Sequence, residues 1–164
     1  MTVTITDPAF DETLQALKNL AKKQIKVGLP STSGGNLSFI LGIQEHGSPV
    51  NRIPPRPVVK PALSSPQVRT AMSEALLTAI SAAWEGDSSA ANSALESAGQ
   101  AGADGIRAFI DSGISPPNAP ITVSGGWMRN RVSGKPVHIP GKGASHPLVD
   151  SGALYAAFSY EIEE

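Results

Sequence analysis

The stretch that decides the fold is residues 64–113, "SSPQVRTAMSEALLTAISAAWEGDSSAANSALESAGQAGADGIRAFIDSG". Apolar residues recur along it at the three- and four-residue spacing of amphipathic helices, with Gly86 as an interruption. It therefore predicts two long helices, over 64–86 and 87–113. Ser65 suits the N-cap of the first helix and Pro66 its first position. The stripe that this helix is expected to bury consists of Val68, Met72, Leu76, Ile80 and Ala83.

The second helix carries a glycine every three residues, at Gly99, Gly102 and Gly105. Each glycine costs about 0.5–1 kcal/mol relative to alanine in a helix interior. Two explanations are open: a neighbouring helix approaches closely at these positions, or the helix is broken there. One face of this helix is expected to consist of Leu95, Ala98, Gly102, Ile106 and Phe109.

Shorter patterns on either side of the helical pair indicate strands. Residues 2–6 alternate β-branched side chains, residues 24–30 form a second short run closed by glycine and proline, and residues 157–163 alternate near the end of the chain. Between the first two runs lies a helical pattern that Asp7 can cap and Pro8 can open.

These elements predict an α+β fold in a single domain over residues 1–164. The two N-terminal strands and the C-terminal strand are expected to form a small, mainly antiparallel sheet. Three to four helices would pack on it, and long extended loops would connect the elements. A further helix is expected over residues 36–47, with Gly47 at its end.

Residues 48–63 are predicted to be an extended proline-rich arm. A residue that precedes proline is driven out of helical geometry, so residues 53–61 are expected to be extended. Such a segment lacks amide donors and fits only a sheet edge or a docking surface. It either lies against its own domain or contacts a partner, and we expect the partner.

Residues 121–147 contain five glycines and three prolines and show little periodicity. We expect a long flexible loop, or a flexible hairpin, of the kind that is usually functional or disordered. Its aromatic and basic side chains could contact phosphates and stack on a base, or touch a neighbouring ring of subunits. They are Trp127, Arg129, Arg131, Lys135 and Lys142.

Composition excludes several classes of chemistry. Thirteen basic residues balance fourteen acidic ones, so no global charge drives the chain toward nucleic acid. The absence of cysteine excludes disulfides, thiol nucleophiles and cysteine-based zinc sites. The N-terminus lacks the pattern of a signal peptide, and no apolar run approaches the roughly 20 residues of a membrane helix.

The enzyme motifs are weak, and we expect no catalytic, cofactor-binding or metal-binding residues. His46, His138 and His146 lack the paired spacing of a zinc helix. The set Ser145, His146 and Asp150 lacks the nucleophile elbow of a hydrolase, and "GKGAS" lacks the frame of a phosphate loop. A small hydrolase around His146 and a nucleic-acid-binding accessory protein are kept as alternatives.

Four short motifs occur in order along the chain. They are E-x-G at Glu45 and Gly47, I-P-x-R-P at residues 53–57, P-P-x-x-P-x-T at residues 116–122, and P-L-x-D-x-G-x-L at residues 147–154. Together they resemble the tail-completion or neck proteins of long-tailed bacteriophages, a group that includes the minor tail protein Z type and related virion-morphogenesis proteins. Val58 stands where that family usually has phenylalanine, and Ser151 where it has threonine.

The resemblance implies a non-enzymatic structural protein in the neck of the virion, assembled in the host cytoplasm. It would form a ring of identical subunits, sixfold by preference and twelvefold as an alternative. Its partners would be adjacent head-completion and tail-terminator or tail-tube proteins, with weak contact to passing DNA and none to a membrane. The expected contacts with a neighbouring subunit or partner involve Ile53, Pro54, Arg56, Pro57, Asp150 and Leu154.

Overall fold

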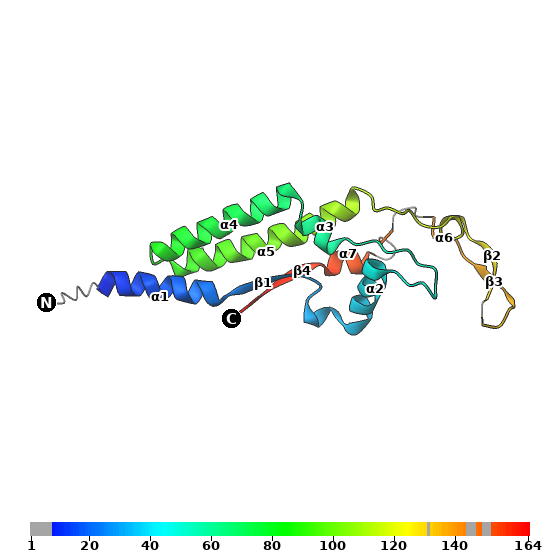
Figure 1. Ribbon diagram of the computed structural model, residues 1–164, viewed down its shortest axis with the longest axis horizontal. Helices are drawn as coiled ribbons and strands as arrows, with labels where there is room; N and C mark the ends of the chain where they lie inside the picture. Colours follow the sequence, from blue (N-terminus) through cyan, green and yellow to red (C-terminus); the bar gives the residue numbers. More distant parts are fainter. Residues whose placement is uncertain (1–7, 131, 144–146, 149–151) are drawn as a thin grey trace. The chain divides into compact units, whose positions relative to one another are not determined.

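The computed structural model describes residues 8–130, 132–143, 147–148 and 152–164 (Figure 1). Over these residues the fold is α+β, as expected, with seven α-helices and two antiparallel sheets of two strands each. The chain divides into two compact units. Unit 1 contains residues 1–32, 59–106 and 158–164, and unit 2 contains residues 33–58 and 107–157. The expectation of a single domain stays a prediction.

Unit 1 is built on three helices that lie side by side (Figure 1). They are α1 (Pro8–Lys22), α4 (Pro66–Trp84) and α5 (Ser88–Asp111), whose last turns belong to unit 2. Ser65 caps α4 by accepting a hydrogen bond from the Val68 amide, and Pro66 opens it, as predicted. The core between the helices is rich in alanine, because small side chains let the helix axes approach closely. Its members are Ala79, Ala82, Ala83, Ala91, Ala94 and Leu95, with Leu17 and Leu20 of α1 against them.

The buried stripe predicted for α4 is wrong in part. Ala83 is buried, but Leu76 and Ile80 are exposed. The helix instead buries its alanines at positions 79, 82 and 83, whereas Leu76, Leu77, Ile80 and Trp84 are exposed. Close packing of helices favours small side chains at this interface. The prediction chose the most hydrophobic side chains of the helix instead, and therefore missed the alanines.

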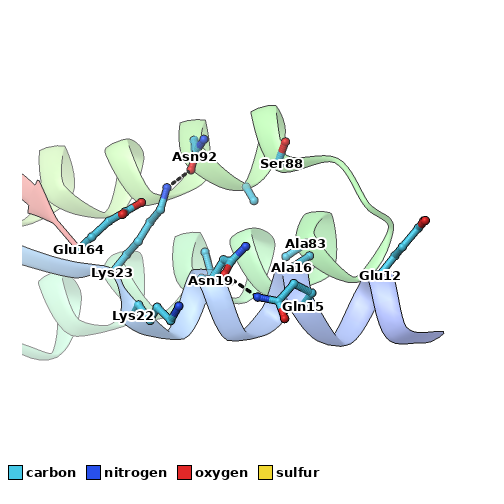
Figure 2. A pocket seen from close by; sticks show the side chains of 12 residues that line it. Glu12, Gln15, Ala16, Asn19, Lys22, Lys23, Ala83, Ser88, Asn92 and Glu164 are labelled. Carbon is cyan, nitrogen blue, oxygen red and sulfur yellow. Dashed lines mark hydrogen bonds between the residues drawn. The ribbon is translucent and has the colours of Figure 1, made fainter. Parts of the chain in front are cut away.

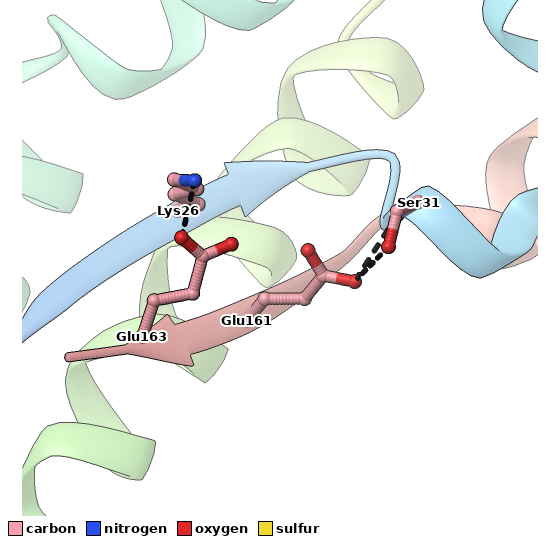
Figure 3. A network of polar contacts seen from close by, with 4 residues as sticks. All are labelled: Lys26, Ser31, Glu161 and Glu163. Carbon is pink, nitrogen blue, oxygen red and sulfur yellow. Dashed lines mark hydrogen bonds and ion pairs between the residues drawn. The ribbon is translucent and has the colours of Figure 1, made fainter.

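The sheet of unit 1 pairs β1 (Gln24–Gly28) with β4 (Ser159–Glu163) in antiparallel register, Gln24 opposite Glu163. This confirms the predicted pairing of residues 24–30 with the C-terminal strand. Lys26 forms an ion pair with Glu163 across the strands, and the amide and hydroxyl of Ser31 both donate to Glu161 (Figure 3). The predicted strand at residues 2–6 lies outside the described residues.

The glycines of α5 lie where other elements approach the helix. A Cβ atom on Gly99 would lie 2.4 Å from the Tyr160 ring of β4, and one on Gly105 would lie 2.4 Å from the Val68 side chain of α4. Gly102 packs in the same way against β1. The helix is continuous, so close approach is the correct explanation and breakage the wrong one. A neighbouring helix accounts for only one of the three positions, because the sheet accounts for the other two.

Unit 2 contains α2, a small sheet and two short helices. The structure gives α2 as Gly35–His46, α6 as Pro120–Ser124, β2 as Gly126–Arg129, β3 as Pro136–Ile139 and α7 as Ala153–Ala157. Gly47 ends α2 with a φ of 74°, as expected. A short 3-10 helix, η1 (Ser31–Ser33), precedes α2. The buried apolar side chains of unit 2 include Val58, Ile110, Ile114 and Leu154.

Two expectations about extended segments need correction. The chain is extended at residues 54–58, but residues 59–61 belong to a short helix, α3 (Val59–Leu63). Pro61 is tolerated there because amides in the first turn of a helix need no intrahelical acceptor. Residues 121–147 are not one long loop, because α6, β2 and β3 occupy much of them. The hairpin alternative is the one that the structure contains.

We predict that replacing Gly99 with alanine lowers the free energy of unfolding by about 1–2 kcal/mol, because the new methyl group would overlap the base of the Tyr160 ring. Gly42 of α2 is the matched control, since a Cβ atom there meets open space. Gly42→Ala should raise stability by about 0.5–1 kcal/mol through helix propensity alone. Urea unfolding of both variants measures the difference, and equal stabilisation by both would show that α5 does not need the glycine.

Candidate functional site

The motif segments singled out in the sequence meet within unit 2. The carboxylate of Glu45, on α2, accepts a hydrogen bond of 2.8 Å from the amide of Val58. Gly47 packs against the next segment so closely that a Cβ atom on it would lie 2.8 Å from the carbonyl oxygen of Ile53. Ile53 in turn exchanges two backbone hydrogen bonds with Ser48. The E-x-G motif therefore holds the start of the proline-rich arm against α2.

Arg56 joins the arm to a second proline motif. Its Nε donates to the carbonyl oxygen of Pro116 at 2.6 Å, and its Nη2 donates to that of Pro117 at 3.0 Å. Its Nη1 reaches the side-chain oxygen of Gln44 at 3.4 Å, and its amide donates to the Gln44 carbonyl. Only 6% of Arg56 is exposed, and this burial lowers the pKa of its guanidinium. Arginine nevertheless keeps its charge at neutral pH, so the site is a buried cation held by carbonyl dipoles.

These contacts bear on the expected partner of Arg56. Every nitrogen of its guanidinium has an acceptor in its own chain. Contact of Arg56 with a neighbouring subunit stays a prediction, and this geometry gives it no support. Val58 is also fully buried, whereas Pro57 between them is exposed. Residues 54–58 thus lie against their own unit, with alternate side chains turned in and out.

The same segments line a cavity of about 640 Å³ in unit 2. Ile53, Pro54, Arg56 and Leu154, four of the expected contact residues, lie in its wall. The hairpin contributes Met128 and Ile139, and Lys142 follows. The remaining lining is mostly apolar or amide-bearing and comes from Leu37, Ile40, Gln44, Asn51, Arg52, Asn118, Ala119, Ile121, Thr122, Leu148, Gly152 and Ala153. The cavity therefore joins residues from all four motifs or their immediate neighbours.

The hairpin of β2 and β3 has two different faces. Its register places Trp127 opposite His138 and Met128 opposite Val137, so the two pairs lie on opposite faces. The face with Met128 and Ile139 borders the cavity. The other face carries Trp127, whose ring meets that of His138 edge-on with centroids 5.3 Å apart, and Arg129 lies two residues along the same face. Lys135 directly precedes β3.

Sequence reasoning missed several of these residues. Gln44, His138 and Ile139 were not expected at a site, although the alternation "PVHI" at residues 136–139 was a readable strand signal. Arg131 and Asp150 lie outside the described residues, as do Ser145 and His146 of the hydrolase alternative. The structure therefore brings Ile53, Pro54, Arg56 and Leu154 together and places Trp127, Arg129 and Lys135 on the hairpin.

A second cavity, of about 600 Å³, lies in unit 1 beside α1 and α5 (Figure 2). Two hydrogen bonds join polar side chains of its lining: Lys23 donates to Asn92 at 2.6 Å and Gln15 to Asn19 at 3.0 Å. None of the predicted site residues lines it. We place the candidate site in unit 2, where Ile53, Pro54, Arg56 and Leu154 line the cavity.

Other classes of site were sought among residues 8–130, 132–143, 147–148 and 152–164. No group of three or more histidine, aspartate or glutamate side chains there is arranged to hold a metal ion. No helix in that part of the chain is long and apolar enough to cross a membrane. Comparisons of the chain with family models, with curated proteins and with solved structures find no match.

We predict that Arg56→Ala lowers the free energy of unfolding of unit 2 by about 2–4 kcal/mol, because the carbonyls of Pro116 and Pro117 lose their donors in a buried place. Arg56→Lys should recover only part of the loss, since an ammonium cannot copy the planar fork. Arg52→Ala, at an exposed arginine of the same segment, is the control and should change little. A stable Arg56→Ala protein that loses contact between copies would instead assign Arg56 to an interface.

Proposed function

We propose that this chain is a structural virion protein of the phage head–tail junction, a neck or tail-completion protein. It forms a ring that joins the tail to the head and lets DNA pass. It is not an enzyme. The observation that carries the proposal is that the separate motifs behind the resemblance hold one another in space. Glu45 accepts a hydrogen bond from the arm, Arg56 of the second motif donates to Pro116 and Pro117 of the third, and Leu154 of the fourth lines the same cavity.

This convergence supports the proposal because short motifs that match by chance need not contact one another. Four weak signals spread over more than a hundred residues meet in one unit. The arm in particular is not a generic linker, since its arginine and Val58 are both buried. The motifs therefore specify a defined tertiary unit, which is the kind of constraint that a subunit of an assembly requires.

The surface of the described chain also favours assembly. Large apolar side chains are exposed on both units, where water contact is unfavourable. They include Phe10, Leu77 and Trp84 in unit 1 and Val50 and Trp127 in unit 2. Extensive exposed apolar surface is typical of protein–protein contacts. We propose a homo-oligomeric ring, sixfold by preference and twelvefold as the alternative, with head-completion and tail-terminator or tail-tube proteins on either side.

A second candidate function is nucleic-acid binding through the hairpin. Trp127 and Arg129 share one exposed face, and an exposed aromatic ring beside basic side chains suits base stacking and phosphate contact. The near-neutral charge of the whole chain argues instead for weak contact with passing DNA. A monomer whose affinity for DNA falls steeply with salt would favour this second function.

We predict that a nonsense mutation of the gene, in a phage or prophage genome that encodes this chain, leaves filled heads and finished tails unjoined. The physical reason is that a missing collar removes the surface on which the two structures meet. Electron microscopy of the lysate counts joined and separate particles, and supplying the intact chain from a plasmid should restore joining. Normal virions in the absence of the chain would refute the proposed function.

A further inference from the structure

The outer face of the hairpin has no partner among the described residues of its own unit beyond the pair Trp127 and His138. Trp127 is 71% exposed although it belongs to a strand. An isolated two-stranded hairpin is marginally stable in water, because it buries too little apolar area. The inner face borders the cavity of unit 2. We therefore expect another protein surface to cover the outer face, which carries Trp127, Arg129 and His138.

The charges of the chain are divided unequally between its two units. Residues 112–149 contain no aspartate or glutamate, and four lysines and arginines lie among them. Unit 2 as a whole has seven lysines and arginines against three acidic residues, a formal charge of +4. Unit 1 has six against eleven, a formal charge of −5. The net charge of −1 hides two units of opposite sign that attract each other between copies.

Unit 1 presents a matching surface on α4. Leu77 is 66% exposed and Trp84 is 61% exposed, with Ile80 between them on the same side of the helix. Glu74 stands one turn before this stripe and Glu85 directly after it, and the sequence from 70 to 85 contains no lysine or arginine. The carboxyl end of the helix adds partial negative charge beside Trp84. This stripe is an apolar strip with an acidic border.

We propose that the outer hairpin face of one copy docks on the exposed α4 stripe of a second copy. Trp127 would meet the apolar strip of Leu77, Ile80 and Trp84, while Arg129 would meet Glu74 or Glu85. This is the usual anatomy of a specific interface, an apolar centre with complementary charges at its rim. The two surfaces are unlike, so the contact is head-to-tail and closes into a ring when the rotation between copies permits. The inference rests on the proposed function and identifies the contact that forms the ring.

The first test removes the aromatic anchor. Trp84→Ala should raise the dissociation constant between copies at least about tenfold, measured by sedimentation equilibrium of the full chain. Phe39→Ala is the matched control, because Phe39 is equally exposed, at 67%, but lies outside both surfaces. Leu77→Gln serves as a second variant if the tryptophan change disturbs folding. Circular dichroism melting verifies that each variant is folded.

The second test reverses charges across the contact. Arg129→Glu and Glu85→Arg should each weaken association, and the double variant should recover most of it. Raising salt from low to high concentration should weaken the wild-type contact, since rim charges are screened. Lys60→Glu, an exposed reversal outside both surfaces, should leave association unchanged. Recovery in the double variant is a result that general loss of stability cannot produce.

Three results would overturn the inference. If the wild-type chain forms a ring and every one of these variants forms the same ring, the contact between copies lies elsewhere. The proposed function would then still stand. A wild-type particle with the mass of a single chain, 16.9 kDa, would remove the contact altogether, and the joining experiment would then decide the proposed function by itself. Loss of duplex-DNA binding in Arg129→Glu, with association unaffected, would assign the hairpin to nucleic acid.

Discussion

The structure of unit 2 depends on one buried cation. The guanidinium of Arg56 lies between the carbonyls of Pro116 and Pro117 and connects segments sixty residues apart. Burying an unpaired charge is costly, so the two segments must stay together for as long as the arginine is buried. The arginine therefore fixes the course of the arm and, through residues 116 and 117, the point from which α6 and the hairpin begin.

The prolines explain why an arginine connects these two segments. A proline carries a carbonyl but no amide hydrogen, so a proline-rich segment has more backbone acceptors than donors. The forked donors of one guanidinium match two successive carbonyls. The proline motif and the arginine motif are thus two halves of one interaction. Each motif is a weak sequence pattern by itself. The hydrogen bonds between them explain why both occur in the same chain.

Local patterns predicted the elements that local chemistry determines. The start of α4 followed from Ser65 and Pro66, and the pairing of β1 with β4 followed from the short strand patterns at residues 24–30 and at the end of the chain. Long-range packing was beyond the sequence. The alanine face of α4 was missed because a hydrophobicity scale favours Leu76 and Ile80, although the side chains that this helix buries are those of Ala79, Ala82 and Ala83. At the candidate site, the residues of the motifs were found, Pro116 and Pro117 among them, but the pairing of Arg56 with their carbonyls was not, because a partner sixty residues away leaves no local signal.

The overall composition also hid a feature of the structure, because it sums over parts of the chain that differ. A net charge near zero suggests a chain without electrostatic preference, yet unit 1 and unit 2 carry opposite charges. The same averaging affects hydrophobicity, since α4 buries Ala79, Ala82 and Ala83 but exposes Leu77, Ile80 and Trp84. The unequal charges of the two units and the unlike faces of α4 cancel when charge and hydrophobicity are summed over the whole chain. They become visible only when each residue is assigned to its unit and to its buried or exposed face. A subunit with unlike, complementary surfaces joins head-to-tail, which is the geometry that a ring requires.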